Sequence, residues 1–346
     1  MKGKGKPMAA DAAKLHKEAI VIDAVCPLLR EKKYIDWYAA GGVTIAAPTV
    51  GAMEGIDVTM RAVAGWKAFI ARNSGNAGKI TQVSSVAEMR RAKRDGRLGL
   101  LFHFQGTDPI EDDLDMVHAY KALGVGIMQL CYNVRNRVGD GADERQDTGL
   151  SYFGVELIKA MNEARMIVDT AHTGIKTSFD ALEASERPVI CSHGNPRKVK
   201  ESHRNLPDDL IKAIAAQGGV IGMVGFPAFV SADKKPTLDQ FIDHIAYTAD
   251  LVGIDHVGLG IDYYQGQYMV MPDDEAQRLY DGLIASGKWR PGTYPPPPHR
   301  YPEGIETPRT LPKLTSRMLA RGFSAADTTK VLGENWLRVY EQVWGQ

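Results

Sequence analysis

The chain has 346 residues, and its 42 lysines and arginines balance its 42 aspartates and glutamates, so the net charge is zero at pH 7. This balance excludes the strongly basic surface of a nucleic-acid-binding protein and gives no attraction to an anionic membrane. No stretch reaches the roughly 18 apolar residues that a membrane span requires. The hydrophobic fraction of 44% and the charged fraction of 24% are typical of a soluble globular protein.

The first residues, MKGKGKPMAADAAK, are basic, but no apolar segment follows them as it would in a signal peptide. We expect residues 1–15 to form a flexible leader and residues 16–346 to form one domain. The three cysteines, Cys26, Cys131 and Cys191, are odd in number and lie in strand-like runs. They do not form a disulfide framework, which favours a cytoplasmic location.

Apolar runs of strand length alternate with segments of helical periodicity along most of the chain. The predicted strands are 19–25, 98–104, 125–131, 166–171, 188–192, 220–224 and 256–260. The predicted helices are 60–73, 86–94, 109–124, 153–165, 173–187, 207–218, 237–252, 274–286, 311–322 and 325–342. This alternation predicts a parallel sheet and favours a (β/α)8 TIM-type barrel, although the pattern reveals no eighth strand. No Gly-rich turn follows the first strand, which disfavours a dinucleotide-binding fold.

Two regions interrupt this rhythm. Residues 30–60, which include Pro48, are interpreted as irregular, with the length of a wall or lid over a site. Residues 264–310 contain the run PGTYPPPPHRYPEG, which must be extended and cannot form a core strand. We interpret 264–310 as a Pro-rich loop insertion that covers the site or forms the contact of a homodimer.

Polar side chains occupy the carboxyl ends of the predicted strands, where the active sites of barrels lie. Two neighbouring strands, joined by one helix, end in His172 and His193, so both imidazoles reach the same edge of the sheet. Two imidazoles at one spot predict a metal site. The polar residues at other strand ends are Asp23, His103, Gln105, Tyr132 and Asp262, while Arg204 and Asn205 follow the strand at 188–192.

Metal-assisted hydrolysis needs neutral ligands for the ion, a base for the water and a cation for the charged end of the substrate. We predict that His172 and His193 are the ligands and that Asp262 is the base. Arg204, together with Asn205, would bind a substrate carboxylate, because a planar guanidinium pairs with a carboxylate better than lysine does. The alternative is a structural ion pair between Arg204 and Asp262.

Five motifs in order carry a family resemblance: MNEARMIVDTAHT, PVICSHGNPR, HRNLPDDLIKAIAAQGGVIGM, GIDHVGLGIDYYQG and GENWLRVYEQV. The chain resembles the membrane (renal) dipeptidase family of zinc metallopeptidases from about residue 20 to residue 343. The resemblance implies an amidohydrolase-type (β/α)8 barrel with two bridged zinc ions. It also implies that His172 and His193 bind one zinc, that Arg204 binds the carboxylate of the substrate and that Asp262 is the catalytic aspartate.

Several family positions are changed in this chain. Val25 and Pro27 stand where the first strand of the family supplies a histidine and an aspartate to the other zinc. Gln105 replaces the bridging glutamate, and Tyr132 replaces a histidine that polarises the scissile carbonyl. Two dications repel each other strongly unless an anion bridges them, so we expect one zinc ion at most.

The ligands expected for that ion are His172, His193 and the oxygen of Gln105. His103 is either a substitute ligand or a core histidine bonded to a backbone carbonyl, and Cys26 points away from the site by strand parity. Tyr132 either donates a hydrogen bond to a substrate oxygen or only forms a wall of the pocket.

The leading hypothesis is a divergent metal-assisted hydrolase that acts on a small amide with a carboxylate, either a dipeptide or an N-acyl amino acid. A second hypothesis is a metal-independent acid–base enzyme, such as a tautomerase, isomerase or lyase, that uses Asp262, Tyr132 and the two histidines. The third is a binding barrel without chemistry. The sequence identifies neither the substrate nor the oligomeric state.

Overall fold

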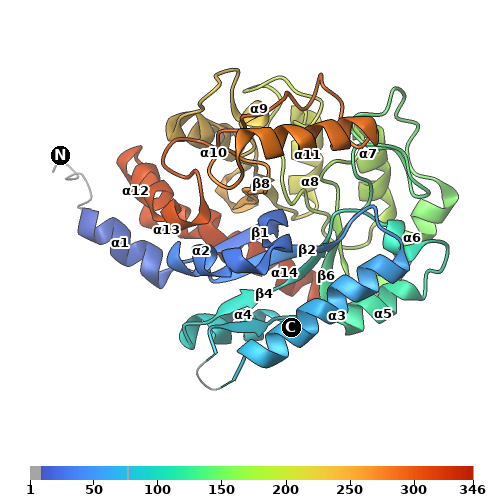
Figure 1. Ribbon diagram of the computed structural model, residues 1–346, viewed down its shortest axis with the longest axis horizontal. Coiled ribbons are helices and arrows are strands. Elements are labelled where there is room, and N and C mark those ends of the chain that lie inside the picture. The colour runs from blue at the N-terminus through green and yellow to red at the C-terminus, as the bar shows by residue number, and fades with distance from the viewer. Residues whose placement is uncertain (1–8, 76–77, 346) are drawn as a thin grey trace.

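The computed structural model describes residues 9–75 and 78–345 as strands surrounded by helices (Figure 1). Its strands are β1 (Ile22–Cys26), β2 (Ile45–Gly51), β3 (Ile80–Gln82), β4 (Leu98–Leu100), β5 (Phe102–Phe104), β6 (Val125–Gln129), β7 (Ile167–Asp169), β8 (Ile221–Met223) and β9 (Val257–Leu259). All paired strands are parallel. This confirms the parallel α/β fold predicted from the alternating pattern.

The strands follow the circuit of a (β/α)8 barrel. β1 pairs with β2, β2 with β5, β5 with β6 and β6 with β7. The segment at Ile190 and Cys191 makes single parallel bridges to β7 on one side and to β8 on the other, and β8 pairs with β9. A side-chain contact joins the ends of the circuit, because the Ile261 amide donates to the Asp23 carboxylate at 2.9 Å.

The strand missing from the sequence pattern is β2, which lies within residues 30–60. The prediction that this region is irregular was wrong. It rested in part on Pro48, because proline is normally excluded from central strands. Here the register between β1 and β2 shifts after Asp23, and β2 changes its partner from β4 to β5 near the same point. A residue without an N–H group is tolerated where the ladder is already irregular.

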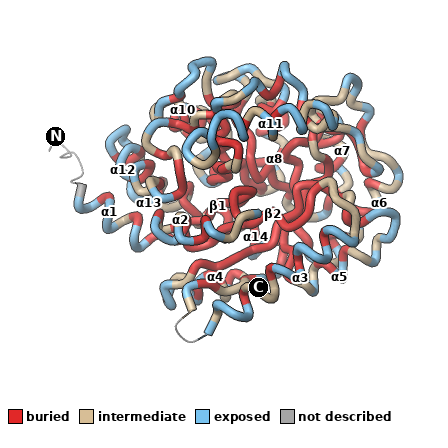
Figure 2. Tube along the Cα trace, viewed as in Figure 1, coloured by how far each residue is buried: buried red, intermediate tan, exposed pale blue. Residues whose placement is uncertain are grey.

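The helices cover the outside of the strands, and the tube in Figure 2 is buried in the centre and exposed on the outer helices. They are α1 (Ala9–Glu18), α2 (Ile35–Ala40), α3 (Ile56–Asn73), α4 (Val86–Arg94), α5 (Met116–Ala122), α6 (Tyr152–Glu163), α7 (Ile175–Ala184), α8 (Asp208–Ala216), α9 (Pro227–Val230), α10 (Leu238–Val252), α11 (Asp273–Ala285), α12 (Pro312–Ala320), α13 (Ala325–Thr329) and α14 (Asn335–Trp344). None of the described helices has the length and apolarity needed to cross a membrane.

Two segments differ from the expected pattern. The leader expected over residues 1–15 lies partly outside the described residues, but from Ala9 the chain is helical. α1 is anchored to α12 by the buried His16, whose Nδ1 lies 2.7 Å from the Thr315 hydroxyl. The helix expected to begin at Pro109 begins only at Met116, after a 3-10 turn over Asp108–Ile110.

The bottom of the barrel is closed by α14. Trp336, Tyr340 and Trp344 stack along this helix with centroid distances of 5.8 and 4.9 Å. The Trp336 indole also donates to the Leu259 carbonyl at 3.0 Å, and its ring lies so close to Gly258 that a Cβ there would be 2.5 Å from it. α14 therefore fixes β9, the strand that carries Asp262.

Candidate active site

A pocket lies at the carboxyl ends of the strands, and the insertion covers it. Its volume is about 120 Å³. The floor and sides include Gln105, Tyr132, His172 and Asp262, which are four of the predicted site residues. The insertion contributes Tyr264, Gln265, Leu279, Leu283, Lys288, Trp289 and Tyr294 to the lining. The insertion therefore covers the site, as one of the two interpretations of residues 264–310 expected.

His172 and His193 lie next to each other below the surface. Their ring centroids are 4.7 Å apart, and the rings are edge to face. The Nδ1 atom of His172 lies 2.7 Å from the Asn133 side-chain oxygen, and Nδ1 of His193 lies 2.8 Å from the Ser192 hydroxyl. Both Nε2 atoms are buried without a hydrogen-bond partner. Burial lowers the pKa of both histidines well below 6.5, so both rings are neutral.

A hydrogen-bond network joins His172 to Arg204 through the insertion. The Arg204 Nε–H donates to the Tyr294 hydroxyl at 3.0 Å, and this hydroxyl donates to the Asn133 oxygen at 3.0 Å. Since that amide oxygen accepts the Nδ1–H of His172 as well, the Nε2 atom of His172 carries a lone pair. Asn133 in turn donates to the carbonyl of Lys288 at 3.0 Å. The network fixes the tautomer of His172 and the position of Arg204.

Asp262 faces the pocket beside Gln105 and is partly exposed to it. Burial raises the pKa of Asp262 to about 8, although the positive charge of Arg204 and a hydrogen bond from Gln105 act in the opposite direction. An amide that donates to Asp262 through its nitrogen leaves its oxygen Oε1 free to bind elsewhere. The carboxyl of Asp262 therefore stays protonated to a higher pH than that of an ordinary aspartate.

Tyr132 stacks on His172 with a centroid distance of 4.1 Å. Its hydroxyl oxygen accepts a hydrogen bond from the Trp289 indole at 3.1 Å, and burial raises the pKa of Tyr132 to about 12. The phenol is thus protonated, and its own hydrogen remains available for a ligand in the pocket.

Three residues at the site have a strained backbone. Asn133, His172 and Asp262 have φ angles of 59°, 59° and 60°, and in the described chain only two other non-glycine residues have positive φ. Left-handed conformations cost energy for side chains with a Cβ and cluster at functional sites. The residues with left-handed backbone angles therefore coincide with the site that the side chains form.

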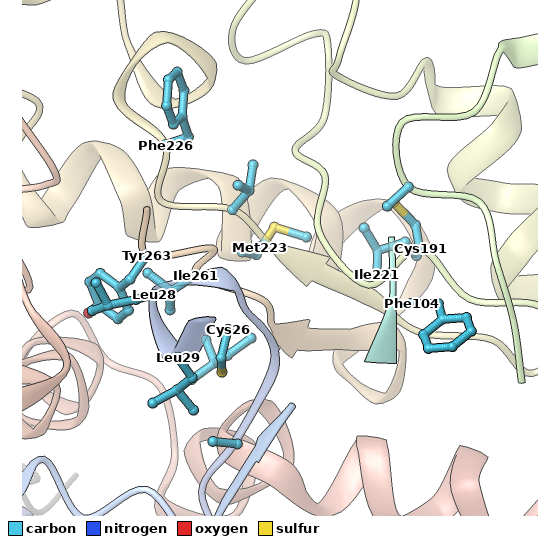
Figure 3. Packing of buried hydrophobic residues seen from close by; sticks show 14 of the residues in the cluster. Cys26, Leu28, Leu29, Phe104, Cys191, Ile221, Met223, Phe226, Ile261 and Tyr263 are labelled. Atoms are coloured by element: carbon cyan, nitrogen blue, oxygen red, sulfur yellow. The ribbon is translucent and has the colours of Figure 1, made fainter. Parts of the chain in front are cut away.

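Other residues considered from the sequence lie outside the pocket lining, and His193 and Arg204 are among them, buried behind it. His103 is fully buried and bonds through Nε2 to the Asp169 carboxylate at 3.1 Å, rather than to a backbone carbonyl. Cys26 is buried in the apolar core, with its thiol 3.4 Å from the Asp23 carbonyl (Figure 3). The side-chain nitrogen of Asn205 donates to the carbonyls of Lys200 and Phe229, so the substrate-binding role of Asn205 stays a prediction.

The donor atoms of this site suit one metal ion. His172 and His193 offer two neutral imidazoles with unpartnered Nε2 atoms, which is the state in which histidine binds metals. Gln105 offers an amide oxygen. Val25 is fully buried and apolar and Pro27 has no donor, so a second ion would have no ligands on their side. Over residues 9–75 and 78–345, no cluster of three or more His, Cys, Asp or Glu side chains is arranged to hold a metal.

Some site residues escaped the sequence analysis. Asn133 follows Tyr132 directly, and a polar residue after a strand end was the available signal. Trp289 and Tyr294 lie in the insertion, about 100 residues beyond the histidines. Aromatic residues in and beside the Pro-rich run were visible, but nothing local connects Tyr294 to Arg204.

Comparison with known proteins is consistent across sequence and structure. The profile of the family described as membrane dipeptidase (peptidase family M19) matches residues 44–287. An amidohydrolase from Pseudomonas aeruginosa is 34% identical, with a TM-score of 0.87 over 97% of this chain and 99% of that one. The dipeptidase verJ from Clonostachys rogersoniana is 28% identical over 292 residues, which are 84% of this chain and 66% of that protein.

A metallo peptidase from Rhodobacter sphaeroides, liganded with a phosphinate mimic of the dipeptide L-Ala-D-Ala, has a similar fold. It is 21% identical, with a TM-score of 0.76 over 94% of this chain and 100% of that one. The barrel of this chain is thus of the amidohydrolase type.

Proposed function

Since the chain belongs to the membrane dipeptidase family (peptidase family M19), we propose that it hydrolyses the amide bond of a small substrate that carries a carboxylate, with one metal ion held by His172, His193 and Gln105. Zinc is the ion that two imidazoles and an oxygen ligand suit best. Hydrolysis consumes one water molecule and releases a carboxylic acid and an amine.

One observation carries this proposal. The Nε2 atoms of His172 and His193 are buried, neutral and without partners, on rings whose centroids are 4.7 Å apart. A buried polar atom without a partner costs about 1–3 kcal/mol, and two such atoms on neighbouring imidazoles are explained when they bind the same ion. Their Nδ1 atoms are hydrogen-bonded, as metal-bound histidines require.

The other residues supply the acid–base chemistry. A metal ion bound there supplies Lewis acidity, which lowers the pKa of water and polarises the scissile carbonyl. Asp262 accepts the proton of the attacking water, and a pKa near neutrality suits it to pass that proton to the leaving amine. Tyr132 donates its free hydroxyl hydrogen to the oxygen of the scissile carbonyl, where negative charge develops.

Arg204 holds the carboxylate of the substrate. Its side chain is 4% exposed, and one of its N–H groups is bound to Tyr294, which lines the pocket. The Nη groups of a guanidinium fixed in this way form a planar fork for a carboxylate. Burial of the guanidinium strengthens its interaction with an anion.

Metal content and turnover test the proposal together. Elemental analysis of the purified protein after reconstitution with zinc should give about one metal ion per chain. Turnover of N-acetyl amino acids or dipeptides should stop on chelation and return when the metal is restored. Turnover that survives chelation would support the metal-independent acid–base enzyme, and a chain that takes up well under one ion would contradict the proposed site.

A further inference from the structure

We propose that the substrate is an N-acyl amino acid with an apolar acyl group, rather than a dipeptide with a free α-ammonium group. This inference rests on the proposed function and concerns the end of the substrate opposite its carboxylate. A dipeptide carries an ammonium on the carbon next to the scissile carbonyl, and an N-acyl amino acid does not. The pocket distinguishes the two by its charges.

The pocket wall offers no free carboxylate to an ammonium group. Glu54 is an acidic residue of the lining, but Arg30 Nη1 lies 3.1 Å from its Oε1 atom and the Ala52 amide donates to Oε2 at 2.9 Å. The pKa of Glu54 is lowered, with the charge of Arg30 and these hydrogen bonds opposing the effect of burial. The charge of Glu54 is therefore balanced by Arg30, and each of its oxygens already accepts a hydrogen bond from the protein.

Asp262 is the other carboxylate in the lining, and it is also engaged. It accepts a hydrogen bond from Gln105 and lies in the field of Arg204. Lys288 adds a further cation to the wall, while the charge of Arg30 is balanced by Glu54. An ammonium group in this pocket would face more cations than free anions, and a desolvated charge without a partner is strongly disfavoured.

The aromatic walls do not replace the missing carboxylate. Aromatic faces attract cations, but several of these rings stack on a neighbour, which covers one face of each. Trp289 and Tyr294 stack on each other at 4.2 Å with an angle of 10° between their planes, and Tyr132 stacks on His172. Phe226 meets Trp289 edge-on, 5.9 Å away. The walls therefore present apolar ring surface rather than an open aromatic cage.

These walls favour an apolar acyl group. Leu279 and Leu283 of α11 close the pocket from the insertion side, with Pro27, Ala52 and Met53 in the same lining. The cavity of about 120 Å³ is smaller than the roughly 300–1,000 Å³ of typical ligand sites, so the acyl group is short. An acetyl group removes apolar surface from water here without bringing an unpaired charge.

Acetyl-alanine and glycyl-alanine provide the matched test, because the two compounds differ only by the ammonium group on the carbon next to the scissile carbonyl. We expect acetyl-alanine to bind the zinc-reconstituted protein at least about tenfold more tightly in calorimetry, for whichever alanine enantiomer binds better, and to show the higher kcat/KM. Equal or tighter binding of glycyl-alanine would overturn the inference, and so would binding of neither compound. Tight binding of acetyl-alanine without turnover would contradict the proposed hydrolysis and leave the inference standing.

A gain of function provides the second test. Arg30→Met frees the Glu54 carboxylate, so the preference for acetyl-alanine over glycyl-alanine should fall at least fivefold or reverse. The matched control is Arg90→Met, which breaks a comparable exposed pair, Arg90–Glu334 at 3.4 Å, outside the pocket. The control should keep the preference of the unchanged protein. An Arg30→Met protein that folds normally and keeps the full preference would contradict the role of Glu54 and Arg30.

Discussion

The two sides of the barrel mouth offer different donor atoms. The side built by β7, the Ile190–Cys191 segment and β9 carries His172, His193 and Asp262, with the buried Arg204 close by. The side built by β1, β5 and β6 ends in Val25, Pro27, Gln105 and Tyr132, none of which is charged. Both sides have the same backbone arrangement and meet in the same pocket.

In the proposed site, one half of the barrel mouth binds the metal ion while the other half is neutral. A neutral side cannot offset the repulsion between two dications, but it does not disturb a single ion held from the opposite side. Substrate binding also remains possible, because Arg204 is held by Tyr294 of the insertion, whose hydroxyl donates to Asn133 next to Tyr132. The following predictions test this division.

Loss of either imidazole should have the largest effect. His172→Ala or His193→Ala should lower kcat/KM by about 10³-fold or more, roughly 4 kcal/mol of transition-state stabilisation, because a metal site with three neutral donors loses one of its strongest ligands. Metal content should fall in parallel, while circular dichroism stays unchanged. His118→Ala, an exposed histidine on α5, is the control. Full metal content in either variant would show that the ion is not bound on this side.

Arg204→Met should mainly affect substrate binding. We expect KM for carboxylate-bearing substrates to rise about 10²-fold, because a buried cation that pairs with a carboxylate is worth about 2–5 kcal/mol when truncated. kcat should change much less. Arg187→Met, which removes a half-buried arginine bonded to the Asn162 carbonyl, should leave KM unchanged. An equal loss in kcat would instead indicate that Arg204 acts in the chemical step.

Asp23→Asn should reveal the cost of a buried carboxyl on the neutral side. Burial raises the pKa of Asp23 to about 7 from 3.8, so the folded protein favours its protonated form. Its contribution to stability is complete below pH 3.8 and is lost as the pH rises through 7. Asparagine is neutral throughout and can still accept from the Ile261 amide. The variant should be more stable than the unchanged protein at pH 8 in urea unfolding, by up to about 4 kcal/mol, and the gain should disappear toward pH 4. A gain independent of pH would contradict the buried titration.

Gln105→Glu should have the smallest effect, and it tests the difference between the two sides of the barrel mouth most directly. A carboxylate ligand in place of an amide should raise the affinity for one zinc ion about tenfold, or roughly 1.4 kcal/mol. The stoichiometry should remain one ion, since Val25 and Pro27 still offer no donor. Gln105→Met should lower the affinity. Two ions per chain in Gln105→Glu would break the division between the two sides.

The sequence predicted the elements whose signals are local. α4 was predicted to the residue, since Ser85 caps it and Gly96 follows it, and α10 was predicted from Thr237 to Gly253. His172, Tyr132 and Asp262 were placed in one pocket, because parallel strands end at the same edge. β2 was missed because Pro48 and the preceding glycines are local signals against a strand. In the folded chain, pairing of β2 with strands on both sides outweighs these signals.

By itself, the sequence determined the parallel barrel and the pair of histidines at its mouth, because periodicity and residue type are properties of short segments. The resemblance to the dipeptidase family added the interpretation that Val25 and Pro27 stand at ligand positions. The tertiary structure decided which atoms remain free. Tyr294 reaches Arg204 across 90 residues of chain, Asn133 fixes the tautomer of His172, and Arg30 occupies Glu54. These contacts depend on how distant segments pack, and they determine the charges that a substrate meets.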